Sequence, residues 1–233
     1  MGVSPAAERT SAGVRRMFDR VAPRYDLANT VFSLGQDRAW RRAAAVATGL
    51  GDGEVAVDVA CGTGALTREL ARLAPGAVVA GFDFSWEMVR RGVGEGGTGR
   101  LAVADALRLP LADGSADVLT IAFGLRNLPE PGQGLLEFRR VLRPGGRLLV
   151  CEFSQPVVPV LRQVYRRYLT RLMPLAARRL SSDPEAYQYL ARSIGSWPDQ
   201  QGLARWVQEA GFEKVRWRNL SGGIVALHQG AAC

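Results

Sequence analysis

The chain has 233 residues, of which 47% are hydrophobic and 22% charged, and its formal net charge at pH 7 is +8. This length fits one domain with a substantial core, no apolar run approaches the ~20 residues that cross a bilayer, and the N-terminal segment lacks the apolar stretch of a secretory signal. Three widely spaced cysteines, Cys61, Cys151 and Cys233, fit neither a disulfide framework nor a zinc site, so we expect a reducing cytoplasm.

The N-terminal part, residues 8–48, is predicted to be helical, with breaks near Ala22-Pro23 and Leu34-Gly35. From residue 51 to 153, short apolar strands alternate with helical stretches, which is typical of a mostly parallel sheet covered by helices on both faces. The predicted strands are Val55–Ala60, Val78–Asp83, Leu101–Ala104, Val118–Phe123 and Arg147–Phe153. Gly145-Gly146 is predicted to form the turn that leads into the fifth strand. The predicted helices fall near 64–74, 85–93 and 132–142.

The C-terminal part begins with a helical insertion at 157–196 and continues with a helix at 199–210 that ends at Gly211. Two closing strands, Lys214–Leu220 and Gly223–His228, are predicted to form a hairpin. We therefore predict a single α/β domain over residues 1–233. Its parts are an N-terminal helical cap (8–48), a cofactor-binding core (51–153), a helical lid insertion (157–196) and a closing helix and strands (199–233).

The turn after the first strand reads Asp58-Val-Ala-Cys-Gly-Thr-Gly64, and Asp83 closes the second strand. Such glycines let a nucleoside approach the backbone, and a carboxylate in the place of Asp83 accepts hydrogen bonds from ribose hydroxyls. A dinucleotide is disfavoured, because the third glycine of its fingerprint is Thr67 here and Asp58 would repel a pyrophosphate. An acid at Asp58 suits the ammonium group of S-adenosylmethionine, and the turn looks like the first motif of class I methyltransferases.

Ligands of such sheets bind outside the carboxyl ends of the strands, so residues that follow different strands converge on one crevice. Gly62, Thr63 and Gly64 are predicted to line the cofactor. Asp105 and Ala106, after the third strand, are predicted to contact adenine through a carboxylate and a backbone amide. For Asp83 and Asp105, a role as a helix cap is the alternative.

The segment Phe123-Gly-Leu-Arg126-Asn127 follows the fourth strand and is predicted to face the methyl acceptor. Methyl transfer depends on alignment of nucleophile, methyl group and sulfur, and a base assists when the acceptor is a hydroxyl or an enolisable carbon. Arg126 is predicted to stabilise a developing phenolate or to orient, with Asn127, a water that takes the proton. The alternative for Arg126 is a structural pair with an Asp.

Five sequence blocks, in order, resemble the ubiquinone/menaquinone biosynthesis C-methyltransferase family over nearly the whole chain. The blocks are Met17–Asn29, Ser33–Arg41, Phe123–Asn127, Arg143–Ser154 and a closing block made of Tyr187–Ile194, Trp197–Gln200 and Gly222–His228. The resemblance implies a Rossmann-like class I methyltransferase fold with seven strands, mostly parallel, and an antiparallel C-terminal hairpin. It also implies methylation of a ring carbon of a polyprenylated quinol, most similar to the actinobacterial conversion of demethylmenaquinol to menaquinol.

The resemblance adds Tyr25, Phe84 and Ala122 to the predicted cofactor contacts, and Asp37 to the predicted catalytic residues. Ala122 stands where family members often have serine, so its contact would come from the backbone. Asp37 stands where many members have histidine, so either Asp37 replaces a histidine base or water held by Arg126 and Asn127 takes the proton. The alternative function is methylation of another aromatic small molecule, such as a polyketide.

The helical insertion carries many arginines and no acid between Val157 and Leu180. Such a segment either forms a lid with solvated arginines or also touches an anionic membrane surface, which suits an acceptor with an isoprenoid tail. Tyr165, Tyr168 and Met173 are predicted to line the quinol pocket. Nucleic acid is not expected as a partner, because motifs of amino-group and cytosine methylases are missing, and a homodimer is left open. His228, the only histidine, is predicted at the end of the last strand as a structural or surface residue.

Overall fold

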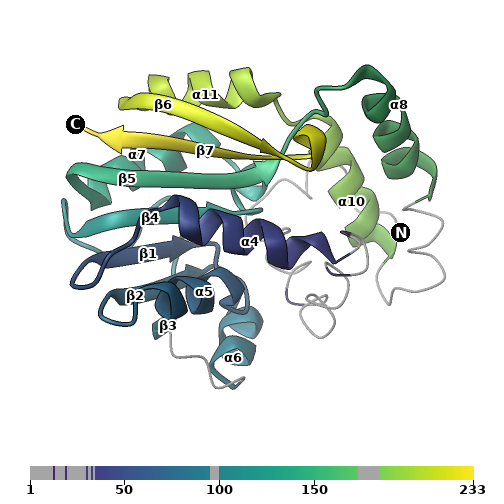
Figure 1. Cartoon of the computed structure of the whole chain (residues 1–233). Helices are drawn as coiled ribbons and strands as arrows, with labels where there is room; N and C mark the ends of the chain where they lie inside the picture. The colour runs from purple at the N-terminus through teal and green to yellow at the C-terminus, as the bar shows by residue number, and fades with distance from the viewer. Residues whose placement is uncertain are drawn as a thin grey trace.

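The computed structural model describes residues 13, 19, 30, 33, 35–94, 100–172 and 184–233, without the side chains of 172 and 184–187. Its centre is a seven-stranded sheet in the order β3-β2-β1-β4-β5-β7-β6 (Figure 1). The strands are β1 Val55–Val59, β2 Val78–Asp83, β3 Arg100–Val103, β4 Ala116–Ala122, β5 Leu142–Phe153, β6 Phe212–Leu220 and β7 Val225–Ala232. β1 to β5 pair in parallel, whereas β7 pairs antiparallel with both β5 and β6. The predicted mostly parallel sheet with an antiparallel C-terminal hairpin is confirmed.

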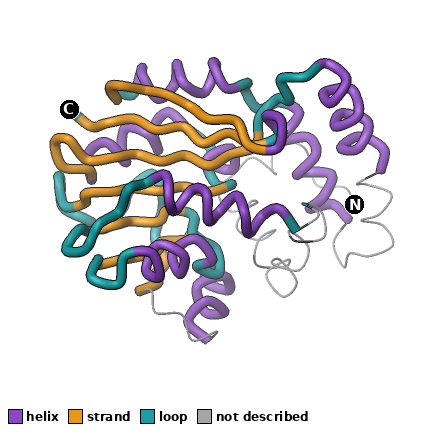
Figure 2. The backbone as a smooth tube through the Cα atoms, viewed as in Figure 1, coloured by secondary structure: helices purple, strands orange, loops and turns teal. Residues whose placement is uncertain are grey.

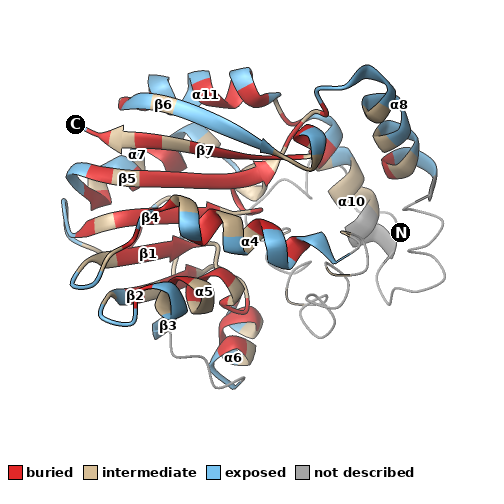
Figure 3. Cartoon of the chain, in the orientation of Figure 1, coloured by how far each residue is buried: buried red, intermediate tan, exposed pale blue. Residues whose placement is uncertain are grey.

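Helices cover both faces of the sheet (Figure 2). The side chains of α4 and α5 pack on one face in one apolar cluster, and those of α7 and α11 pack on the other face in a second cluster. The central strands are buried on both faces, which explains why β1 and β4 are mostly apolar in sequence (Figure 3). The helices are α4 Gln36–Ala47, α5 Ala65–Leu73, α6 Trp86–Gly94, α7 Pro131–Val141, α8 Pro159–Arg167, α10 Pro184–Gly195 and α11 Gln200–Glu209, with a π-helical turn η3 Tyr168–Leu172 and 3₁₀ turns η2 Leu125–Asn127 and η4 Ser221–Gly223.

Two strand boundaries differ from the sequence prediction by more than two residues, the start of β5 and the end of β7. β5 begins at Leu142, which pairs with Ala116, so the glycine pair lies inside an irregular strand start instead of before it. β7 continues to Ala232, so the prediction that His228 ends the last strand is wrong. His228 is 1% exposed, and its Nε2 lies 2.8 Å from the Gln200 carbonyl oxygen. Of the two roles predicted for His228, structural or surface, the burial therefore favours the structural one.

The turn η4 between the last two strands joins three distant parts of the chain. The Ser221 hydroxyl accepts a hydrogen bond of 2.9 Å from the Trp40 indole on α4 and donates to the Gln36 amide oxygen. The Gly222 carbonyl accepts from the Val157 amide at 3.0 Å, just before α8. This turn therefore fixes both α4 and the start of the helical insertion against the sheet.

Replacing Gly222 by alanine is expected to lower the free energy of unfolding by about 1–3 kcal/mol. Gly222 has φ of 67°, and a Cβ there would lie 2.5 Å from Leu161 Cδ2 of α8. Urea denaturation measures the change. The matched control is Gly195→Ala, because a Cβ at Gly195 meets no atom within 4 Å. Equal stability of the Gly222 variant and wild type would contradict the packing described for η4.

Candidate functional site

The turn after β1 and the end of β2 form one unit at the carboxyl edge of the sheet. Asp83 is half-buried, and its two carboxylate oxygens accept hydrogen bonds from the Gly62 amide at 2.7 Å and the Ser85 amide at 2.8 Å. Gly62 and Gly64 adopt left-handed backbone conformations, with φ of 59° and 83°, which side chains at these positions would strain. Each carboxylate oxygen retains a second lone pair, so Asp83 can still accept from a diol. Both predicted roles of Asp83, cap and ribose acceptor, are compatible with this geometry.

Asp58 lies beneath this turn and is 1% exposed. Its two oxygens accept hydrogen bonds from the hydroxyls of Thr67, at 2.7 Å, and Thr120, at 2.8 Å. Burial raises the pKa of Asp58 to about 6, while the two hydroxyls act to lower it. In the sequence prediction, Thr67 mattered only because it replaces the third glycine of the dinucleotide fingerprint. The structure gives it a positive role, because its hydroxyl satisfies a buried carboxylate.

The raised pKa of Asp58 predicts a pH-dependent affinity for S-adenosylmethionine. Above about pH 6 the carboxylate is ionised, and in its predicted role it then attracts the ammonium group of the cofactor. The cofactor Kd is therefore expected to fall several-fold between pH 5 and 7. The raised pKa of Asp58 also affects the free energy of unfolding, which changes with pH in the opposite direction to cofactor affinity. Between about pH 3.8 and 6 the folded state binds more protons than the unfolded state, so the free energy of unfolding falls as pH rises.

Thr67→Val tests this prediction, because it removes a hydroxyl donor that lowers the pKa of Asp58. Calorimetric titrations are expected to show the Kd transition moved to higher pH, with near-equal affinity once Asp58 is ionised in both proteins. Thr170→Val is the control, since the Thr170 hydroxyl bonds only the Arg166 carbonyl among the described residues. A Kd that is flat from pH 5 to 8 in wild type would contradict the role of Asp58.

The remaining predicted cofactor residues lie around this unit. Thr63 is buried within the turn, and Phe84 and Ala122 are half-buried directly after β2 and at the end of β4. Asp105 is exposed and caps its own turn by accepting from the Leu107 amide at 2.9 Å, while Ala106 is buried. Tyr25 lies outside the described residues.

A further acidic residue enters the site from the N-terminal segment. Asp19 accepts a hydrogen bond of 2.5 Å from the Ser85 hydroxyl, beside Asp83. Burial raises the pKa of Asp83, and the charge of Asp19 raises it further. Asp19 lies in the Met17–Asn29 block but was not among the predicted site residues, since only the fold brings it next to the second strand.

Arg126 is held by a buried ion pair with Glu152 at the end of β5. Its Nη1 lies 2.8 Å from Glu152 Oε1 and also donates to the Phe123 carbonyl, and the two side chains are 5% and 0% exposed. The Arg126 Nε is buried, and no described residue accepts a hydrogen bond from it. The predicted structural alternative was a pair with an Asp. The structure instead shows Arg126 paired with Glu152. The N–H of the Arg126 Nε stays unused among the described residues.

Asn127 and Asp37 make different connections. The Asn127 amide donates to the Phe123 carbonyl at 3.2 Å, and its oxygen accepts from the Tyr189 hydroxyl of α10 at 3.2 Å. Asp37 is buried in the first turn of α4 and bonds Arg41 at 2.5 Å. Among the described residues, no hydrogen bond joins Asp37 to Arg126 or Asn127. Arg126 and Asn127 are thus brought together, whereas the role of Asp37 as a base stays a prediction.

Aromatic rings surround this end of the sheet. Phe123 packs 5.0 Å from Phe153 and 6.0 Å from Trp40, measured between ring centroids. The guanidinium carbon of Arg126 lies 5.1 Å from the centroid of Phe153. Phe123 has φ of 58°, a conformation that is uncommon for a bulky residue and tends to occur at functional sites. The arrangement places apolar rings and an oriented cation beside the glycine turn.

Comparisons with known proteins identify the family and the fold of the chain. Residues 6–232 match the model of the ubiE/COQ5 methyltransferase family. The demethylmenaquinone methyltransferase of Corynebacterium kroppenstedtii is 50% identical over 95% of both chains, and that of Mycobacterium sp. strain JLS is 53% identical over 92% of both chains. A SAM-dependent methyltransferase structure from Thermotoga maritima has a TM-score of 0.69 at 18% identity, covering 94% of this chain and 100% of that chain, which establishes the class I methyltransferase fold. The chain therefore belongs to the ubiE/COQ5 methyltransferase family and is a methyltransferase that uses S-adenosylmethionine.

Proposed function

We propose that the protein transfers the methyl group of S-adenosylmethionine to a ring carbon of demethylmenaquinol, forming menaquinol. The names of its relatives at 50–53% identity supply the substrate. The buried and unused Arg126 Nε at the acceptor end of the crevice is the observation that supports it best. S-adenosylmethionine supplies an electrophilic methyl group. The ring carbon forms the new bond as the carbon–sulfur bond breaks, and the proton on that carbon then leaves to water.

In this proposal Arg126 binds the quinol oxygen. As a ring oxygen ionises, negative charge spreads to the reacting carbon, and a cation beside the oxygen stabilises the charge. Glu152 and the Phe123 carbonyl hold Nη1 and so fix the guanidinium. We assign its remaining N–H groups to the acceptor. Asn127, fixed by Tyr189, lies on the same 3₁₀ turn and positions the water. Asp83, Asp58 and the glycine turn hold the cofactor.

Conversion of demethylmenaquinol by the purified protein tests the function. The protein is incubated with methyl-labelled S-adenosylmethionine and reduced demethylmenaquinone, and the product is analysed by mass spectrometry for one added label on the ring. Failure to methylate demethylmenaquinol, with turnover of a hydroxylated polyketide instead, would refute the proposed acceptor and support the alternative one.

We further propose that α8 contacts the membrane that holds the quinol tail. Within the described residues, no helix combines the length and apolarity that crossing a bilayer requires. The outer side of α8 nevertheless carries Val160 and Val164, which are 71% and 57% exposed, and Val157 just before it is 50% exposed. Its inner side packs through Tyr165 against the cluster of Leu169 and Ile194, against which Phe153 also packs. A short helix with exposed valines and flanking arginines is suited to an anionic lipid surface.

Charge reversal at Arg166 and Arg167 is expected to reduce binding to anionic vesicles at least ~10-fold, since each cation near such a surface contributes about 1 kcal/mol. Co-sedimentation with phosphatidylglycerol vesicles measures the loss. The control reverses Arg205 and Arg218, two exposed arginines on other elements. If both pairs of substitutions weaken binding equally, the contact is not localised on α8.

A further inference from the structure

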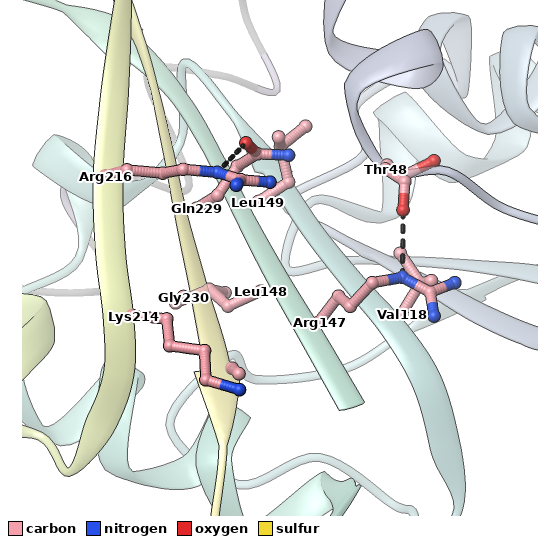
Figure 4. A pocket seen from close by; sticks show the side chains of 10 residues that line it. Thr48, Val118, Arg147, Leu148, Leu149, Lys214, Arg216, Gln229 and Gly230 are labelled. Atoms are coloured by element: carbon pink, nitrogen blue, oxygen red, sulfur yellow. Dashed lines mark hydrogen bonds between the residues drawn. The ribbon is translucent and has the colours of Figure 1, made fainter. Parts of the chain in front are cut away.

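A hollow of about 150 Å³ lies near the other end of the sheet, away from the cofactor and acceptor residues (Figure 4). Arg147 and Thr48 form one wall, and Lys214 and Arg216 rise from the edge strand β6 on the other. The chain between Arg147 and Phe153 is extended, at roughly 3.3 Å per residue, so about 20 Å separates the hollow from the acceptor end. It is therefore distinct from the crevice described above.

A β-bulge in β6 brings the cations to this hollow. Glu213 pairs with Ala231 and Arg216 pairs with Gln229, so β6 carries one extra residue relative to β7. An extra residue reverses the alternation of side chains, which directs Val215 into the core and Arg216 onto the face of the sheet that α4 covers. Lys214, inside the bulge, has φ of 51°, an unfavourable conformation for a lysine.

The positive charges of the hollow are only partly balanced. Arg147 forms an ion pair of 2.6 Å with Glu54 and donates to the Thr48 carbonyl at 2.9 Å. Arg216 donates through Nε to the Gln229 side-chain oxygen at 3.0 Å, a neutral partner. No carboxylate of the described residues lies within 4.0 Å of the Lys214 ammonium or the Arg216 guanidinium. Two unpaired cations thus line the same concave surface.

We propose that this hollow binds a small oxyanion of the phosphate type, with Lys214 and Arg216 as its charged ligands. An anion between two cations replaces their repulsion by charge-assisted hydrogen bonds. The volume is below the roughly 300–1,000 Å³ of pockets for drug-sized molecules, which favours a single phosphate group over a nucleotide. Phosphate can come from solution or from a lipid headgroup. The distance from the acceptor end, where α8 packs, favours the free anion.

Nuclear magnetic resonance of the full-length protein tests the proposal. Lys214 is the only lysine, so reductive ¹³C-methylation labels its amine and the N-terminal amine, and methylation keeps the charge. Inorganic phosphate is titrated at constant ionic strength, with chloride as the balancing anion. Saturable shifts of the Lys214 methyl signal and of the Gly230 and Ala231 amides are expected. The phosphate Kd, followed on those amides, is expected to rise at least ~10-fold in Lys214→Gln and Arg216→Gln.

Arg205→Gln on α11 is the control, because Arg205 is exposed on a helix of the opposite face, and its phosphate Kd is expected to equal that of wild type. Shifts that do not saturate, or that chloride reproduces, would show that the signals respond to ionic screening and not to a bound phosphate. Either result would overturn the proposal. So would an unchanged Kd in both neutralised variants. If inorganic phosphate produces no shift but phosphatidylglycerol vesicles shift the same amides, the hollow contacts a lipid headgroup and the free-anion site is refuted.

Discussion

Replacing Asp83 by alanine is expected to raise the Kd for S-adenosylmethionine at least ~100-fold. Asp83 already accepts the Gly62 and Ser85 amides, and its remaining lone pairs can accept from the two hydroxyls of a ribose, as predicted. Each hydrogen bond to a charged group contributes about 1.5–3 kcal/mol to binding. The variant cannot form the two hydrogen bonds that the ribose hydroxyls would donate to Asp83. The loss of the Gly62 contact also releases the glycine turn. Isothermal titration calorimetry measures the change directly.

The matched control for this variant is Asp52→Ala. Asp52 likewise accepts a backbone amide, that of Gly76 at 2.8 Å, but it lies before β1 instead of after β2. Thermal melting of both variants shows whether the fold is retained. If the folded Asp83 variant bound the cofactor as tightly as the Asp52 variant, Asp83 would be a helix cap only, which was the alternative open from the sequence.

Breaking the pair between Arg126 and Glu152 is expected to lower the free energy of unfolding by about 3–5 kcal/mol in either single variant. The two side chains are 5% and 0% exposed, so removing one partner leaves an uncompensated charge in the interior. Arg126→Gln and Glu152→Gln together replace both charges, and the double variant is expected to recover much of the loss. Urea denaturation of the four proteins gives the coupling energy.

Turnover separates the role of Arg126 in chemistry from its role in stability. The double variant, although folded, lacks the donor proposed to face the quinol oxygen. Its kcat is expected to fall at least ~100-fold with little change in the Kd for S-adenosylmethionine, because removing one charge-stabilising donor typically has such an effect. The Asp52→Ala protein, altered before β1, provides a catalytic reference away from the site. A double variant with wild-type kcat would show that Arg126 only stabilises the fold.

The strands of the sheet and the turns between them could be predicted because their sequence signals are local. Apolar runs, glycine turns and a closing acid are each read within a few residues, so β1, β2 and Asp83 were found where expected. Arg126 and Asn127 were found in the same way, as polar residues directly after a buried strand. The boundaries were harder. β7 was predicted to stop too early, because small residues such as Gly230 and Ala231 carry little strand signal although they pair along β5.

The support of the site could not be predicted, because it depends on contacts between distant residues. Thr120 reaches Asp58 across 62 positions, and Glu152 reaches Arg126 across 26. Neither threonine nor glutamate has a distinctive pattern of its own. The alternative left open for Arg126 was a pair with an Asp, and the order of strands places Glu152 next to it instead. Position in the sheet, which a single sequence does not state, decides these roles.

The position of β7 also has a consequence for the order of folding. It follows β5 and β6 in the chain, yet it lies between them in the finished sheet. Until it arrives, the outer edge of β5 has no partner, and an unpaired apolar edge can associate with other chains. The nascent methyltransferase therefore carries an open β5 edge until β7 has been synthesised and pairs with it.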